Sequence, residues 1–381
     1  MKQNECTYIR SLGNSLNRKE RALWRRVDRD IFESDSNHIP SNVSKRRKNT
    51  EFKEYFILYC GDEAVGRAAA TVDEGWLGEK KESVGFIDDL VIDRSHKKLA
   101  GMLIDRCLGV LKETGVEGVV ARSHGFPALA AQEFDDLPPT HLPCNPSWYI
   151  GLFEQKGFVK HKEWGNFRFT LPSEASSDSA PRLNALVSSC KAEIVPLNTR
   201  NRSQVKQYSD LTYEVLGEHY GYTPTRFMDS HSFFKALFFG LLCRIGKFRI
   251  YVLRNDSGEV VGFFSYHPDY NMAANSADKY LRKGSFNPLA LLAIPAFIGS
   301  LHRAKRATIG SIGLDEAWRR RGFVMVFDHG LKFVLDEGYK QLDTGPVLIE
   351  NAVVVKMAGA FQKKYGVNME RMTYYTLQYK F

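Results

Sequence analysis

The sequence predicts a mixed α/β sheet that occurs twice in tandem. In each half of the chain a strand, a basic segment, a helix and a further strand follow one another, and a unit of this kind implies parallel pairing around the helix. A stretch rich in Ser, Pro and acidic residues, 172–181, lies near the middle and is typical of a flexible linker. At 381 residues the chain also exceeds what one hydrophobic core usually organises.

These observations predict two domains. We expect an N-terminal domain over 1–172, a linker over 173–190 and a C-terminal domain over 191–381. Each domain is expected to contain a β-hairpin, because two β-rich runs flank a short turn in each half. The paired runs are 54–60 with 64–72, and 247–254 with 259–266.

The strand, basic segment and helix that follow align between the halves without gaps. Ile92 falls on Leu314, and Lys97 to Ala100 fall on Arg319 to Gly322. Both helices are expected to end at a glycine, Gly115 and Gly338, as helices commonly do. The second helix carries an apolar stripe at helical spacing. Its members are Phe323, Val326, Phe327, Gly330, Leu331 and Val334.

The chain is basic, with 53 Lys and Arg against 44 Asp and Glu, a formal charge of +9. This balance favours anionic partners in general and leaves nucleotides, phosphorylated cofactors, nucleic acid and anionic membranes open. Basic residues cluster at 18–26, 44–49 and 319–322. Such a cluster is more often a solvated face than a binding site.

We expect a cytoplasmic protein without a membrane span. The six cysteines form no Cys-x-x-Cys pair, and no secretory signal precedes them. The most apolar stretch, 288–301, contains Pro295 and is shorter than the roughly 20 residues that a bilayer crossing needs. It is expected to form a buried helix or a pair of turns.

The second basic segment is placed to bind an anion. Arg319, Arg320 and Arg321 precede Gly322 where the chain passes from a strand into a helix. The first amide groups of a helix lack intrahelical partners, and guanidinium groups suit phosphate oxygens. A glycine here would let the backbone approach a ligand closely. The alternative, that the arginines only decorate an exposed turn, carries equal weight on local spacing alone.

In this context the segment resembles the cofactor loop of the GNAT superfamily of acyl-CoA-dependent N-acyltransferases. That loop has an Arg/Gln-x-x-Gly-x-Gly/Ala pattern, which 319–324 matches except at its last position. The resemblance implies that acetyl-CoA or another acyl-CoA is the cofactor. It implies a set of cofactor-binding residues on the strand, on the loop and after the next strand. These are Ile312, Gly313, Leu314, Arg319, Arg320, Arg321, Gly322, Phe323, Val324 and Asn351.

The first half resembles the same superfamily with a degenerate loop. Its segment 97–100 lacks the glycine and the guanidinium groups, and Lys offers phosphate only a point charge. We therefore expect this half to keep the fold without the cofactor. Asp89, His124 and Tyr149 are predicted to line an acceptor groove as substrate-binding residues, although a lone His after a strand is more often structural.

Amine acylation by a thioester needs a base for the acceptor. Asp343 and Glu350 are the candidate catalytic carboxylates, and for each the alternative is a structural pair or a solvated helix residue. No metal is expected, because the sequence has no His-Glu-x-x-His and no His/Cys ligand spacing. It also has no P-loop, no dinucleotide fingerprint and no Gly-x-Ser-x-Gly elbow.

The predicted function is therefore acyl transfer from acyl-CoA, with acetyl-CoA as the expected donor, to an amine of a small molecule or peptide. One alternative is a Fem-type transferase that uses aminoacyl-tRNA, and another is a non-catalytic protein that binds CoA or a small molecule. Nucleic acid is not the expected partner, but it is left open. The acceptor, the acyl length and the oligomeric state stay open.

Overall fold

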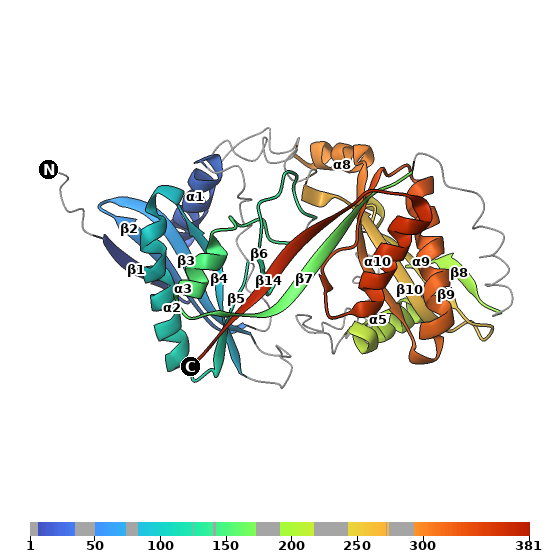
Figure 1. Cartoon of the computed structure of the whole chain (residues 1–381), viewed down its shortest axis with the longest axis horizontal. Coiled ribbons are helices and arrows are strands. Elements are labelled where there is room, and N and C mark those ends of the chain that lie inside the picture. Colours follow the sequence, from blue (N-terminus) through green and yellow to red (C-terminus); the bar gives the residue numbers. More distant parts are fainter. Residues whose placement is uncertain are drawn as a thin grey trace. The chain divides into compact units, whose positions relative to one another are not determined.

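The chain divides into two compact units (Figure 1). The computed structural model describes residues 7–34, 50–73, 83–123, 125–139, 142–172, 191–216, 243–271, 273 and 293–381. Unit 1 consists of Met1–Gly165, Pro346–Asn351 and Met372–Phe381. Unit 2 consists of Asn166–Gly345 and Ala352–Arg371. The predicted linker, 173–190, lies outside the described residues.

Unit 1 is built on a mixed sheet in the order β1-β2-β3-β4-β5-β14. Its pairs are antiparallel except β4 with β5, which is parallel. Two short strands lie off this path: β6 pairs with β14 and β13 pairs with β7. The strands are β1 (Thr7–Gly13), β2 (Thr50–Cys60), β3 (Glu63–Asp73), β4 (Val84–Ile92), β5 (Gly118–Ala121), β6 (Leu129–Ala130), β7 (Val159–Thr170), β13 (Val347–Leu348) and β14 (Met369–Lys380).

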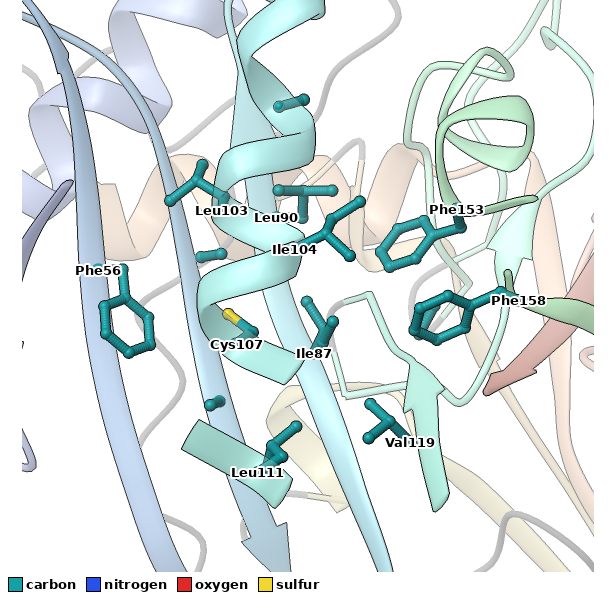
Figure 2. Close-up of a cluster of buried hydrophobic side chains, with 14 of the residues drawn as sticks. Phe56, Ile87, Leu90, Leu103, Ile104, Cys107, Leu111, Val119, Phe153 and Phe158 are labelled. Atoms are coloured by element: carbon teal, nitrogen blue, oxygen red, sulfur yellow. The ribbon is translucent and has the colours of Figure 1, made fainter. Parts of the chain in front are cut away.

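The main core of unit 1 lies between this sheet and two helices, α2 (Ala100–Glu113) and α3 (Tyr149–Gln155). Figure 2 shows Leu103, Ile104 and Cys107 of α2 directed at the strands. All three side chains are fully buried. A smaller core lies under α1 (Arg18–Ser34), which packs over β3 and β4. A short 3₁₀ helix, η1 (Arg94–Leu99), precedes α2.

Unit 2 repeats this plan with a sheet in the order β7-β12-β11-β10-β9-β8. The pairs are again antiparallel except one, β11 with β12, which is parallel. Its further strands are β8 (Glu193–Pro196), β9 (Arg249–Arg254), β10 (Val260–Pro268), β11 (Arg306–Leu314) and β12 (Gln341–Asp343). Its helices are α5 (Arg202–Leu216), α8 (Ala293–Arg303), η3 (Glu316–Trp318), α9 (Arg319–Asp336) and α10 (Ala352–Tyr365).

Helix α9 packs on the sheet through the predicted apolar stripe. Val326, Leu331 and Val334 are each at most 3% exposed, and a Cβ built on Gly330 would lie 2.4 Å from the ring of Phe264. Gly338 after α9 has a φ of +80°. The left-handed conformation ends the helix at the glycine that the sequence indicates, and Gly115 after α2 does the same at +78°.

The predicted mixed α/β class is confirmed, and so are both hairpins, β2 with β3 and β9 with β10. Each unit also includes a strand segment from the other half of the chain. The end of β14, from Met372, belongs to unit 1 and pairs with β5. The end of β7, from Asn166, belongs to unit 2 and pairs with β12.

The apolar stretch 288–301 was expected to be buried, and this expectation is wrong for the part that the structure describes. Residues 293–303 form α8, but Ile294 at its start is 66% exposed and only Leu301 is fully covered. Among the described residues, no helix is both long enough and apolar enough to cross a bilayer.

Candidate functional site in unit 2

The segment that joins β11 to α9 is a short 3₁₀ turn. Asp315 closes the end of β11, and its Oδ1 accepts a hydrogen bond of 2.9 Å from the amide of Ala317 in η3. Helix α9 then begins at Arg319. Arg319 to Gly322 were expected in a loop ahead of the helix, and this is corrected: they form its first turn, because η3 makes the turn between strand and helix.

The first turn of α9 has no side-chain cap. The residue before it, Trp318, has helical dihedral angles and accepts no capping hydrogen bond. The side chain of Arg319 is exposed, while those of Arg320, Arg321 and Val324 lie outside the described part of the structure. The amide of Arg319 donates to the carbonyl of Glu316, because η3 runs directly into α9. The positive end of the helix and the guanidinium group of Arg319 still attract anions.

Gly322 has a packing role that the sequence did not indicate. A Cβ at this position would lie 2.6 Å from Cδ2 of Leu314 and 3.2 Å from Cδ2 of Leu253. The glycine was expected to let the backbone approach a ligand, but its open side faces the sheet. It therefore lets α9 lie close on β11. Phe323 is half-buried and stacks on Phe327 with ring centroids 6.1 Å apart.

Strands β11 and β12 part beside this turn. Their parallel register runs from Arg306 opposite Gln341 to Thr308 opposite Asp343. After Asp343 the amide of Thr344 donates to the carbonyl of Phe167 on β7. The chain after β12 therefore follows β7, its other neighbour in the sheet, and leaves β11. The rest of β11 stays paired with β10 as far as Leu314.

The polar groups of Ile312 and Leu314 point toward the side where the strands part. The amide of Asp315 donates to the carbonyl of Val261 on β10, so the neighbouring pair, Leu314 with Gly262, is a non-hydrogen-bonded pair. The same alternation turns the amide and carbonyl of Ile312 away from β10. Gly313 is buried, and a Cβ on it would lie 2.3 Å from the ring of Phe263.

Unit 1 contains the same arrangement, and there its own side chains occupy it. The parallel register of β4 and β5 ends at Ile87 opposite Ala121, and the amide of Asp93 bonds back to β3. The amide of Ile92 therefore points away from β3, and it donates to the hydroxyl of Tyr149 at 3.1 Å. Tyr149 is only 2% exposed. This placement favours a structural role over the predicted substrate-binding role.

A buried ionic network occupies the space beyond. Nε of Arg122 donates to Asp88 at 2.6 Å, and its other nitrogens bond to Asp73 and Thr71. The guanidinium carbon lies 3.9 Å from the ring centre of Phe86. Both carboxylates and the guanidinium group are at most 8% exposed. The opening that corresponds to the one in unit 2 is thus filled.

The equivalent positions in unit 2 hold small residues. Strand positions in unit 1 are matched to those in unit 2 by two features: the bulges in β4 and β11, and the parallel register that each of these strands shares with its neighbour. For the helices, the bond from Phe158 N–H to Phe153 O matches that from Val367 N–H to Gln362 O. On this basis Asp88 corresponds to Gly310, Arg122 to Gly345 and Tyr149 to Ala358. Gly345 and Ala358 are buried, and a Cβ built on Gly345 would lie 3.0 Å from the carbonyl oxygen of Ile309.

Gly310, Gly345 and Ala358 were not predicted as site residues. The gapless alignment of the halves already places Asp88 on Gly310, so that signal was present in the sequence. The other two equivalences depend on strand register and helix-end hydrogen bonds, which the sequence alone does not give.

The two candidate catalytic carboxylates occupy different settings. Asp343 is fully buried, with Oδ1 3.0 Å from Nε of Arg168 and Oδ2 3.6 Å from Nε of Arg306. Burial raises the pKa of Asp343, while the two guanidinium groups oppose that rise. An amine cannot reach this carboxylate without opening the core, which favours the structural alternative. Glu350, in unit 1, is exposed and pairs with Lys162 at 3.0 Å.

The remaining predicted residues do not join the site in unit 2. Asp89 lies in unit 1, 6% exposed, at the bulge of β4 with a φ of +53°. Asn351 also belongs to unit 1; it immediately precedes α10, and its amide bonds to the carbonyl of Leu348. His124 lies outside the described residues. Within the described ranges, no group of three or more His, Cys, Asp or Glu side chains is arranged to hold a metal.

Comparison with solved structures identifies which known fold the chain has. The chain resembles the GCN5-related glucosamine N-acetyltransferase region of a fungal multi-domain GH3 β-N-acetylglucosaminidase, with a TM-score of 0.58 and 14% identity over 98% of this chain. It spans 38% of that protein. It also resembles a tandem GNAT protein of the clavulanic acid biosynthesis pathway, with a TM-score of 0.54 and 11% identity over 98% of both chains.

A GCN5-related N-acetyltransferase from Anabaena variabilis matches 97% of the chain, and 72% of its own, with a TM-score of 0.50 and 10% identity. No family model matches the sequence, and no curated protein matches it. The likeness is therefore one of structure. The tandem relative covers both units together, in agreement with the repeat that the two sheets show. The chain thus has the GNAT fold, present twice in tandem.

Proposed function

We propose that unit 2 binds an acyl-CoA and that the protein transfers the acyl group to an amine. One observation carries this proposal: three positions that hold charged or aromatic side chains in unit 1 hold glycine or alanine in unit 2. The three exchanges, from unit 1 to unit 2, are Asp88 to Gly310, Arg122 to Gly345 and Tyr149 to Ala358.

The residues that would hold the cofactor lie in sequence along β11 and α9. The outward amides of Ile312 and Leu314 would bond to the pantetheine arm and the thioester carbonyl. The positive end of α9 and the guanidinium group of Arg319 would hold the diphosphate. When bound, the cofactor supplies an activated acyl thioester. Acetyl-CoA is the first donor to test, since the structural neighbours include acetyltransferases.

Replacing Arg319 with glutamate is expected to abolish binding of CoA without unfolding the chain. The side chain is exposed, so the fold does not depend on it, whereas a carboxylate there repels the diphosphate. Saturating CoA should raise the Tm of the natural protein by about 5–10 °C, because a ligand at roughly 100 times its Kd stabilises by about 2.7 kcal/mol and each kcal/mol shifts the Tm of a domain of this size by about 2–4 °C. The variant should show no rise.

Lys332→Glu is the matched control, because Lys332 is an exposed cation on the same helix. It should keep the Tm shift. Release of thiol from acetyl-CoA over a panel of amines then tests transfer. An unchanged Tm of the natural protein at millimolar CoA would contradict the proposal, and a bound cofactor without turnover on any amine would limit it to binding.

A further inference from the structure

Helix α1 in unit 1 has one face in the core and one strongly basic face. Trp24 and Val27 are 0% and 2% exposed and pack with Leu12 against the sheet. The first half of the helix exposes five cations on its other side, Arg26 among them. The other four, Arg18, Lys19, Arg21 and Arg25, are called the α1 cations below.

The α1 cations form no ion pair with the carboxylates that the structure describes. The acid among them, Glu20, is engaged in a capping box: Asn17 Oδ1 accepts the amides of Lys19 and Glu20, and Glu20 Oε2 accepts the amide of Asn17. Cations in the first turns of a helix oppose its dipole, so their position costs stability.

An aromatic pair, one ring exposed and the other half-buried, lies on the same face of the sheet. Tyr8 of β1 is 43% exposed and stacks on Tyr59 of β2, with ring centroids 5.0 Å apart and planes 6° apart. Tyr8 lies opposite Tyr59 and the exposed Arg10 opposite Ile57, and both partners pack in the same core as Leu12. Since Leu12 packs with α1, this is the face that carries the helix.

We propose that the α1 cations, Arg10 and Tyr8 together bind single-stranded nucleic acid. Guanidinium groups suit the phosphates of a backbone, and an exposed aromatic ring suits stacking with a base. An anionic membrane fits less well. Over residues 18–27 of the helix, Ala22 is the exposed apolar residue between the cations, and the large apolar side chains Leu23, Trp24 and Val27 pack in the core. This proposal does not depend on the acyl-CoA site.

Fluorescence anisotropy with a labelled oligouridylate and a labelled oligothymidylate tests the proposal on the full chain. The variant Arg18→Glu/Arg21→Glu/Arg25→Glu should bind at least about tenfold more weakly. It should also lower the slope of log affinity against log salt by about 2, since each lost phosphate contact removes about 0.7 for single strands. Tyr8→Ala should weaken binding of both oligonucleotides several-fold and leave heparin binding unchanged.

A charge-matched control separates this surface from the overall charge. Lys112→Glu/Lys305→Glu/Lys340→Glu changes three exposed lysines elsewhere by the same total charge. Equal weakening by both triple variants would overturn the proposal, as would anionic vesicles binding where neither oligonucleotide does. Preference for one of the two oligonucleotides would identify RNA or DNA as the partner. A Tm measured for each variant shows that the fold is intact.

Discussion

Replacing Arg122 with methionine is expected to destabilise the chain by about 3–5 kcal/mol, the cost of breaking a buried ion pair by removing one partner. The change removes the guanidinium group that Asp88 and Asp73 share, and these carboxylates are only 5% and 8% exposed. Denaturant unfolding measures the loss. The exposed pair of Lys156 and Asp105 provides the control, because Lys156→Met should cost less than about 1 kcal/mol. Equal losses in the two variants would contradict the account of the network.

The same network predicts how stability depends on pH. Burial by itself would raise the pKa of Asp88, but Arg122 and the hydrogen bond from Thr71 outweigh it and hold that pKa below its ordinary value. A carboxyl whose pKa is lower in the folded state adds stability above its unfolded pKa, about 4, and loses it as the pH falls below that. In the Arg122→Met variant this component should disappear, which Tm values at neutral pH and at about pH 2.5, below the unfolded pKa, would reveal.

Replacing Ala358 with tyrosine is expected to weaken CoA binding at least about a hundredfold. In unit 1 the hydroxyl of the equivalent Tyr149 accepts a hydrogen bond from the amide of Ile92. The new hydroxyl should likewise accept the amide of Leu314, which the cofactor needs as a donor. Calorimetric titration with CoA measures the loss. Ala360→Tyr, at an exposed position of the same helix, should bind CoA like the natural protein.

A second variant covers the case in which the added ring disturbs α10. Gly310→Asp recreates the carboxylate that Asp88 provides in unit 1, at a position that is exposed. Its Cβ would lie 2.8 Å from Oγ of Ser265 and 3.3 Å from the ring of Phe248, so these two side chains must shift to admit it. Full CoA binding by both folded variants would show that the opening beside β11 is not the cofactor site.

The elements of both units were predictable because their signals are local. Alternating apolar residues mark β2, β3, β9 and β10, and the helices α2 and α9 end at the glycines that the sequence offers, with positive φ at both. The exchange of strand ends was not predictable. Whether β14 pairs with β5 of the other half depends on contacts between residues far apart in sequence. No residue type in β14 indicates which strand it will pair with.

The site was predictable in outline and not in detail. The arginine-rich segment indicated the correct strand–helix junction. The role predicted for Gly322 differs from the one observed, because this glycine lets α9 pack on Leu314. The carboxylate chosen as a base, Asp343, could not be distinguished from a structural one by its place after a strand. Its burial between Arg168 and Arg306 follows from the packing of β7 and β11, which lie far apart in sequence.

The stoichiometry of CoA binding tests the central claim most directly. Calorimetric titration of the full chain should give one CoA per chain, bound by unit 2, with binding lost in Arg319→Glu and kept in Lys332→Glu. Two CoA molecules per chain would show that Tyr149 and Arg122 do not close unit 1, and binding that Arg319→Glu leaves unchanged would contradict the assignment of the diphosphate to the start of α9.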